Sequence, residues 1–408
     1  MRLEEQRALV RELARRHMAI ATSDEMKIKD RRWRDTMSRR TPDRVSVWLN
    51  LRACRREVQP VEGLRCDDPF LRAVEDELRW RQACHSFGDD AVVLPYWPVE
   101  AGVRNEVPHG WGVRIKHERP PTPGGAWKYD PPLRDEADFA KLQAPRFYHD
   151  EAETARRRER YEDLLGDIIP VRIACSSRAT SNLGNVAAYL IGLDALMLNL
   201  AMNPAMIHRL MAFLRDASLA TLDQIEPMGL LTENNDAPKH FSDSLKTSPD
   251  CEPVKVSDLW HWTNSQEFEL VGPDMWREFC LDYQRPIVER FGAVSYGCCE
   301  NLTLKIDDIL SLGNLRVFVS SPWTDLEAAA AKCAERGVCI EWRQKATDVT
   351  FASDLERCRA HLERGLRVTQ GLNRFIVLQE VQTLNNASQR FKDWVTMAIE
   401  LSERLSVG

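Results

Sequence analysis

The sequence predicts an α/β fold, and the pattern fits a (β/α)8 TIM barrel best. Eight short apolar runs have the length of strands, and the later runs alternate with longer helical segments, which is typical of βαβ units around a parallel sheet. The chain has 408 residues, of which 43% are hydrophobic and 29% charged, so it can bury a full core. A doubly wound open sheet is the alternative architecture.

Residues 1–65 predict an N-terminal helical extension that packs on a barrel formed by residues 66–408. This stretch is rich in Arg and Glu, and its apolar residues recur at helical spacing, which indicates surface helices over 2–20 and 31–40.

The predicted strands are short apolar runs bounded by polar or turn-forming residues. Residues 98–165 form a long irregular excursion after the first strand, because Pro108, Pro120, Pro121, Pro123, Gly124, Gly125, Pro131, Pro132 and Pro145 interrupt every periodic pattern. The eight strands are Ala91–Tyr96, Ile169–Ala174, Gly229–Thr232, Val256–Trp262, Ala293–Cys298, Leu315–Ser320, Gly337–Trp342 and Arg374–Gln379.

The helices between these strands have recognisable starts. Asn203 and Pro204 supply a cap and a first-turn proline for a helix to about residue 226, and Gly272-Pro273 opens another. No clear helix is predicted over 233–255. Three further helices have capping residues at Thr324, Ser353 and Asn386.

Charge and cysteine content narrow the class of protein. The formal net charge of −6 gives no basic field that would attract nucleic acid or an anionic membrane surface. Eleven cysteines, an odd number, fit free thiols in a reducing compartment, and no stretch approaches the roughly 18 apolar residues of a membrane span. We expect a cytoplasmic protein whose substrate is a small molecule, with a homodimer left open.

In such a barrel the working residues lie at the carboxyl ends of the strands. Glu267, which follows the fourth strand, is a candidate general base or ligand there. Four tryptophans near strand ends could form an aromatic wall for a flat ligand, or simply pack: Trp97, Trp262, Trp323 and Trp342. The candidate substrate-binding residues are Tyr96, Trp97, Asn234, His261, Trp323 and Lys345.

Alternation along the strands predicts which side chains face the barrel interior. In the fifth strand the small residues Ser295, Gly297 and Cys299 point inward, whereas Val294 and Tyr296 face the helices. Buried charges need a partner or a function, so Glu341 and Arg343 are candidate catalytic residues, or else members of a structural Arg343–Glu341 or Arg172–Glu341 pair. The other predicted inward residues are Cys339, Arg172 and Ser176.

Cys298, Cys299 and Glu300 form the sharpest local feature, because thiolates are strong zinc ligands and zinc also accepts His and carboxylates. Adjacent cysteines on a regular strand diverge, so both can bind one ion only if the chain turns there. The alternative is that both are buried small hydrophobes. His261 or Glu267 could complete the site.

Nucleotide-binding and hydrolase motifs are absent from the sequence. No GxGxxG follows a strand, and no GxxxxGK[ST] loop, GxSxG elbow or HExxH occurs.

The strand-end segments taken together resemble the uroporphyrinogen decarboxylase-like superfamily over roughly residues 85–405. That resemblance implies a (β/α)8 barrel and one of two activities, tetrapyrrole decarboxylation or zinc-dependent methyl transfer with a corrinoid protein. The segments that carry it are residues 266–268, 271–279, 296–300, 315–323 and 379–383.

The decarboxylase branch fits poorly. Val47-Trp48 and Arg55 are similar to its N-terminal Trp–Arg motif, but the position of its essential Asp holds Pro95-Tyr96-Trp97, and the position of its C-terminal His reads Gln379-Glu380. A decarboxylase needs those groups to bind carboxylates and to stabilise a protonated pyrrole.

The methyltransferase branch holds zinc with a strand-end His-x-Cys and a later Cys. Here Cys298 or Cys299 matches the strand-end Cys, while Gly297 or Tyr296 replaces the His and the later Cys is missing. The remaining ligands would come from other residues, with four candidates: Glu267, His261, Glu300 and Glu380.

By this resemblance we expect methyl transfer between a small methylated substrate or acceptor and a corrinoid (cobalamin) carried by a partner protein, assisted by zinc. Glu267 and Glu300 would be a ligand or a proton donor, and Arg343 or Lys345 would hold an anionic substrate group. The alternatives are a metal-free lyase or decarboxylase of the same superfamily, and a barrel that binds a ligand without turnover.

Overall fold

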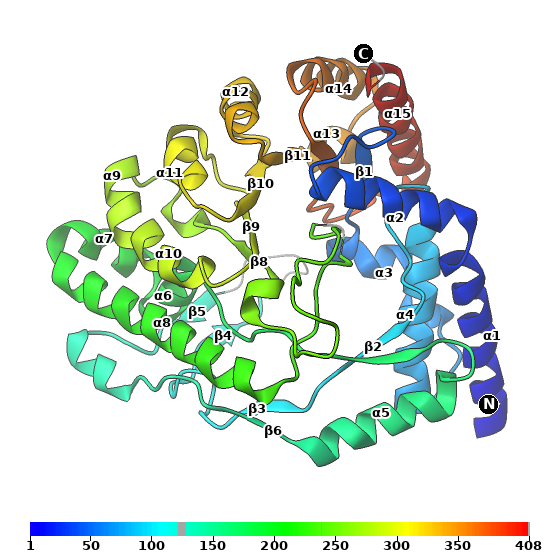
Figure 1. The fold of residues 1–408 in the computed structure, drawn as a ribbon, viewed down its shortest axis with the longest axis horizontal. Coiled ribbons are helices and arrows are strands. Elements are labelled where there is room, and N and C mark those ends of the chain that lie inside the picture. The colour runs from blue at the N-terminus through cyan, green and yellow to red at the C-terminus, as the bar shows by residue number, and fades with distance from the viewer. Residues whose placement is uncertain (121–127, 238, 407–408) are drawn as a thin grey trace.

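The computed structural model describes residues 1–120, 128–237 and 239–406, and its main feature is a six-stranded parallel sheet in the order β1-β12-β11-β10-β9-β8 (Figure 1). Three two-stranded pairs accompany it, β2–β7 parallel and β3–β6 and β4–β5 antiparallel. The strands are β1 (Ser46–Leu49), β2 (Trp97–Glu100), β3 (Val103–Asn105), β4 (Lys116–Glu118), β5 (Lys128–Asp130), β6 (Phe147–His149), β7 (Val171–Ala174), β8 (Trp260–Thr263), β9 (Ala293–Tyr296), β10 (Leu315–Ser320), β11 (Cys339–Gln344) and β12 (Arg374–Leu378).

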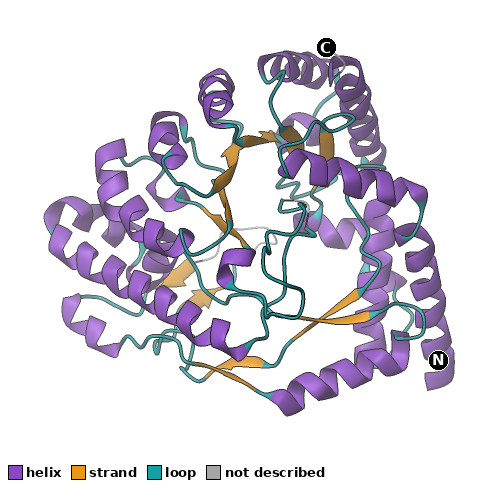
Figure 2. Ribbon diagram, viewed as in Figure 1, coloured by secondary structure: helices purple, strands orange, loops and turns teal. Residues whose placement is uncertain are grey.

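Helices surround most of this curved sheet (Figure 2). They are α1 (Leu3–Ala21), α2 (Asp24–Met37), α3 (Arg55–Val58), α4 (Pro69–His85), α5 (Glu151–Leu165), α6 (Leu183–Ile191), α7 (Leu193–Met202), α8 (Pro204–Ile225), α9 (Pro273–Trp276), α10 (Asp282–Val288), α11 (Ile306–Leu310), α12 (Leu326–Arg336), α13 (Ala346–Thr350), α14 (Glu356–Val368) and α15 (Ser388–Ser406).

The α/β prediction is confirmed, and its later strands are placed well. The strand predicted at Leu315–Ser320 is β10, and those predicted from Ala293, Gly337 and Arg374 are β9, β11 and β12 within two residues. The strands expected from Ile169 and Val256 are shorter, as β7 and β8. The helix after Asn203 is α8, whose cap is the Asn203 side chain accepting the N–H of Met206.

The first predicted strand, Ala91–Tyr96, is wrong, and a strand inside the predicted helical extension, β1, was missed. The reason lies in side-chain hydrogen bonds. The N–H groups of Leu49 and Val47 donate to the carboxylates of Asp89 and Asp90 at 2.8 Å each, and the Asp90 N–H donates to Val47 O, so two carboxylates and a single backbone bond hold β1 there. The sheet therefore begins within the first 65 residues, as the edge strand β1 pairs with β12.

The predicted strand Gly229–Thr232 is also not regular. The Thr232 N–H donates to Cys175 O after β7, and the Asn234 side chain bridges the backbone of Trp260 in β8. These contacts place the segment between β7 and β8, but the described residues do not form one closed eight-stranded sheet.

The excursion over residues 98–165 is less irregular than predicted. It holds the short strands β3 to β6 and ends in the helix α5, whose cap is the Asp150 side chain. The predicted Pro/Gly interruption at Pro121, Pro123, Gly124 and Gly125 lies outside the described residues.

The inner face of the curved sheet has an apolar floor at the amino ends of its strands. Trp260, Val317, Cys339 and Phe375, each in the first half of its strand, pack together there with Trp33 of α2. Trp33 meets the Phe375 ring edge-on with centroids 5.1 Å apart. Because apolar side chains fill the inner face at the amino ends of the strands, its polar side chains lie at the carboxyl ends.

No single helix in the described part of the chain combines the length and apolar character needed to cross a membrane. The bent pair α6 and α7 reaches that length only when both halves are taken together, and both helices contribute buried residues to the main core.

Candidate metal centre and active site

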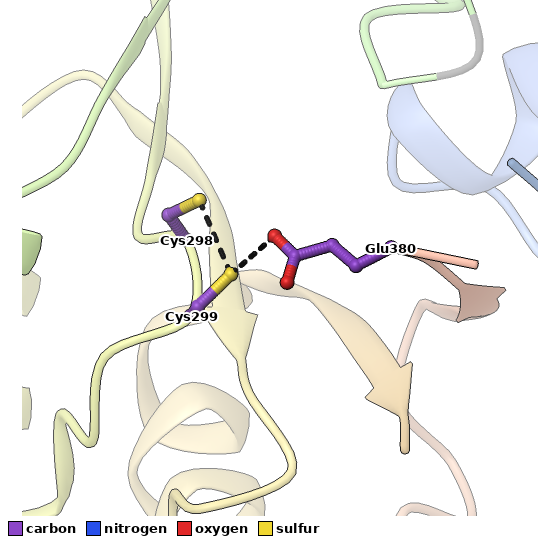
Figure 3. A group of neighbouring side chains, drawn as sticks. All are labelled: Cys298, Cys299 and Glu380. Carbon is purple, nitrogen blue, oxygen red and sulfur yellow. Dashed lines mark hydrogen bonds between the residues drawn. The ribbon is translucent and has the colours of Figure 1, made fainter. Parts of the chain in front are cut away.

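The chain turns sharply directly after β9, and this turn brings two thiols together. Gly297 has φ +117°, and a Cβ there would lie 2.9 Å from the Val319 side chain, so this position requires glycine. The Sγ atoms of Cys298 and Cys299 are consequently 3.6 Å apart (Figure 3). The turn that two adjacent cysteines need in order to share one ion is present.

Glu380 supplies a carboxylate to the same cluster from the far side of the sheet. It follows β12 in the left-handed region, with φ +63°, and its Oε1 accepts the Cys299 thiol at 2.6 Å (Figure 3). Two strands separate β9 from β12, which in a flat sheet means about 14 Å between strand axes. The contact exists because the sheet curves around its inner face.

A network of buried charges lies beside the thiols. Arg343 Nη1 donates to Cys298 Sγ at 3.5 Å and to Cys299 Sγ at 3.6 Å, and Arg343 Nε donates to Glu341 Oε1 at 2.7 Å. Lys239 Nζ reaches the same Glu341 oxygen at 3.3 Å. Because Glu341 and Arg343 alternate to the inner side of β11, as predicted, the strand aims both at the cluster.

The network carries two cations and one carboxylate, so it favours one negative charge on the cysteines. The Cys299 hydrogen bond and the Arg343 guanidinium lower the pKa of Cys298 to about 7, against the effect of burial. Cys299 shares its single S–H proton between Cys298 and Glu380, and its pKa is raised by the neighbouring thiol, by burial and by that carboxylate. Cys298 is therefore the thiol that ionises first.

In this network, burial and ion pairing shift each pKa in opposite directions. Burial alone raises the pKa of a carboxyl, but Lys239 and Arg343 outweigh it and hold the pKa of Glu341 below its ordinary value. Burial lowers the pKa of Lys239, against the attraction of Glu341.

The cluster fits a zinc ion by its donor set. One ligand atom each from Cys298, Cys299 and Glu380 lies within 4.8 Å of the others, and Glu380 is exposed, so the group is open to solvent. Two soft thiolates and a carboxylate are ligands that zinc accepts, and a site with three protein ligands keeps a position for substrate. Arg343 would offset the negative charge of such a ligand set.

Glu300 does not face the cluster as the predicted ligand or proton donor. Its fully buried carboxylate accepts the N–H of Ser265 and the N–H of Cys298, each at 2.9 Å, and burial raises its pKa. These bonds tie the turn after β9 to the end of β8. Glu300 is a positioning residue because both of its oxygens are already occupied by backbone donors.

Glu267 is likewise outside the cluster. Its Oε1 accepts Asn185 Nδ2 of α6 at 2.9 Å, and its Oε2 lies 3.3 Å from where a Cβ on Gly184 would be. The residue that lies beside Cys298 and Cys299 as a third candidate ligand is Glu380, and Glu267 is not part of this group. The short helical turn after β8 carries Glu267 towards the helix layer.

The side chains of His261 and Asn234 make hydrogen bonds within the fold and do not reach the cluster. His261 Nε2 lies 2.6 Å from Ser181 Oγ, and its ring stacks on Phe291 at 4.1 Å, on the helix side of β8. Burial lowers the pKa of His261 to about 4. The Asn234 side chain uses both its oxygen and its nitrogen on the backbone of Trp260. Side chains alternate along β8, and because Trp260 and Trp262 take its inner side, His261 points to the helix side.

The predicted aromatic wall does not assemble. Trp97 begins β2 instead of ending it, and packs in a second apolar cluster with Val10 and Leu78 from α1 and α4. Trp262 donates its Nε1–H to Gly297 O at 2.9 Å and so supports the cysteine turn, and Trp342 faces Gly365 of α14. Trp323 is 56% exposed.

Tyr96 and Lys345 each take part in a cation–π contact. The Arg172 guanidinium lies 4.3 Å from the centre of the Tyr96 ring, before β2, so Arg172 does not reach Glu341. Lys345 Nζ lies 5.1 Å from the centre of the exposed Trp323 ring after β11. The structure therefore leaves Trp323 and Lys345 at the carboxyl edge and Tyr96 at the opposite one.

Lys239 was missed by sequence reasoning. It lies in the segment 233–255, which as predicted forms no helix in its described part, and which instead enters the inner face of the sheet. His240 stacks on Trp260 at 5.2 Å and Phe241 joins the apolar floor. No local signal marks Lys239, although His240 and Phe241 beside it indicate a loop that buries part of itself.

Comparison with known proteins gives a likeness of fold. No protein-family model matches the chain, and no curated protein matches it. Among solved structures, a methyltransferase from Methanosarcina mazei is similar, with a TM-score of 0.51 and 14% sequence identity, and the match covers 91% of this chain and 98% of that one. At this identity the likeness concerns the fold alone.

Proposed function

We propose that the chain is a methyltransferase that moves a methyl group between a small methylated substrate or acceptor and a corrinoid carried by a partner protein, with zinc held by Cys298, Cys299 and Glu380. The observation that carries this proposal is the open thiol–thiol–carboxylate cluster at the carboxyl ends of parallel strands, where barrel enzymes place their chemistry. The fold likeness to a methyltransferase supports it. We also propose that β2, β7 and residues 229–235 complete a (β/α)8 barrel with the main sheet.

Zinc, when bound, supplies Lewis acidity that lowers the pKa of an acceptor thiol or polarises the heteroatom that leaves a methylated donor. The chain's own side chains hold the ligand atoms in place and orient the substrate. Arg343 keeps the two sulfurs in a cationic field, and its Nη2, buried and without a partner, is free to orient an anionic group of the substrate. Glu341 accepts a hydrogen bond from the guanidinium and holds it in place, and Lys239 pairs with Glu341.

Exposed apolar side chains at the same edge support a protein partner. The loops after β8, β9, β10 and β11 each present one large exposed apolar residue, Leu270, Leu304, Trp323 and Phe351. Leu270 is 97% exposed. Apolar groups gathered on one polar edge are typical of an interaction surface, and a partner docked there would present its corrinoid to the cluster.

The test is the zinc content of protein purified without chelator, by elemental analysis. We expect about one zinc per chain in the native protein and in Cys251→Ser, whose exposed thiol is a matched control, and loss of most zinc in Cys299→Ser. Methyl transfer from methylated donors to free cob(I)alamin should be lost together with the metal.

Two outcomes would contradict the proposal. Full zinc and full transfer in Cys299→Ser would remove the cluster from the chemistry. A native protein that takes up no added zinc would favour the metal-free lyase or the ligand-binding barrel instead.

A further inference from the structure

A cavity beside β11 opens near the carboxyl ends of β10 and β11 and extends to the helices α12 and α14. Its volume is about 970 Å³, and it opens between α12 and α14, which stand apart with β11 between them (Figure 1). Trp342 and Gln344 line it, whereas Glu341 and Arg343 of the same strand face inward. None of Cys298, Cys299 and Glu380 lines this cavity, so binding there does not depend on the proposed zinc site, although Lys345 and Phe351 of the carboxyl edge border it.

One face of α14 brings two guanidinium groups and a histidine to the cavity. Arg357, His361 and Arg364 occupy positions i, i+4 and i+7 and all line it. Neither guanidinium has an ion pair or hydrogen bond within the described part of the chain, although Glu363, between them in the sequence, pairs with Arg404. Two free guanidinium groups on one wall are suited to an anion with several acceptor oxygens.

Gln344 provides a second, independent indication of a ligand. It is only 6% exposed, and its side-chain nitrogen has no acceptor among the described residues. A buried donor without a partner is costly, and such groups are rare in folded proteins. A ligand oxygen in the cavity would satisfy it.

The acidic residues that line the cavity determine which groups the rest of the ligand can have. Asp325 and Asp354 accept backbone N–H groups at the starts of α12 and α14, so they are already used. Glu327 and Asp348 line the cavity with carboxylates that have no partner in the described part of the chain. Free carboxylates favour hydroxyl donors and disfavour a ligand that is anionic throughout.

We propose that this cavity binds a small phosphate ester bearing hydroxyl groups, such as a sugar phosphate, with the phosphate on Arg357, Arg364 and Gln344 and the hydroxyls on Glu327 and Asp348. A phosphate offers three terminal oxygens to two guanidinium forks and one amide, which a single carboxylate cannot match. The volume is in the usual range for small-molecule sites.

The test is calorimetric titration of the full chain with ribose 5-phosphate. We expect saturable binding in the native protein, and at least about a hundredfold weaker binding in Arg357→Ala/Arg364→Ala, since each charge-assisted contact contributes roughly tenfold or more. Arg359→Ala is the matched control, because a helix turns Arg359 about 160° away from that face, and it should bind as the native protein does.

Gln344→Leu should weaken binding while thermal unfolding remains cooperative, which tests the buried contact apart from surface charge. No binding of ribose 5-phosphate to the native protein would overturn the proposal. Equal weakening in Arg359→Ala would also overturn it, since the effect would then come from net charge.

Discussion

Two buried carboxylates anchor neighbouring parts of this sheet, and they differ in how completely they are paired. Asp90, beside β1, and Glu341, in β11, both have no exposed surface, and each is held by two cations. Asp90 Oδ1 and Oδ2 each accept two hydrogen bonds, which come from Arg32, Arg44 and the Val47 N–H.

The Glu341 network is left incomplete. Glu341 Oε2 and Arg343 Nη2 are buried without partners, and the remaining contacts of Arg343 go to two thiols at an edge open to solvent. A fully satisfied ionic network serves the fold, whereas a network with spare donors and acceptors beside reactive groups indicates a place for a ligand.

Removing Asp90 should give the largest effect on stability. Asp90→Ala leaves the buried Arg32 and Arg44 without their shared carboxylate, so the free energy of unfolding should fall by about 3–5 kcal/mol in urea denaturation. Asp43→Ala is the control, because the Asp43 side chain is 56% exposed and should cost about 1 kcal/mol or less. Equal losses would mean that the Asp90 network is not the anchor of β1.

Removing Arg343 should act on thiol chemistry more than on the fold. In zinc-free protein, Arg343→Gln takes away the cation beside Cys298, so the pKa of that thiol should rise from about 7 towards its ordinary value. Alkylation of Cys298 by iodoacetamide at pH 7, followed by peptide mass spectrometry, should slow roughly tenfold. Lys345→Gln, two residues further along the chain and without contact to the sulfurs, should leave the rate unchanged; if it slows alkylation equally, long-range charge explains the effect.

A further expected effect is a pH dependence of stability at Asp89, next to Asp90. Burial raises the pKa of Asp89 to about 7, against the N–H groups of Leu49 and Ala91 that lower it. The folded state therefore holds a proton that the unfolded chain releases near pH 4, and this contribution to stability is lost as pH rises from about 4 through about 7.

Asp89→Asn should remove that contribution, which is at most about 1.4 kcal/mol per pH unit. The measurement is the difference in unfolding free energy between the two proteins at pH 5 and pH 7.5, so that other titrating groups cancel. A difference that does not change with pH would mean that Asp89 is ionised in the folded state.

The sequence was most informative where strands are buried on both faces. In β10 and β11 the apolar runs predicted the strand positions, and in β11 alternation also predicted that Cys339, Glu341 and Arg343 face inward. It was least informative at β1, a four-residue strand next to charged residues, where pairing depends on the distant carboxylates Asp89 and Asp90.

The residues of the candidate site likewise divide into those that the sequence placed and those that only the tertiary structure placed. The sequence by itself determined that Glu341 and Arg343 lie on the inner side of β11, because side chains alternate with a period of two wherever a strand is regular. Only the tertiary structure decided that Glu380 and Lys239 join them while Glu267, Glu300 and His261 do not. That choice depends on the curvature of the sheet and on a loop entering its inner face, and both are set by packing between segments far apart in the chain.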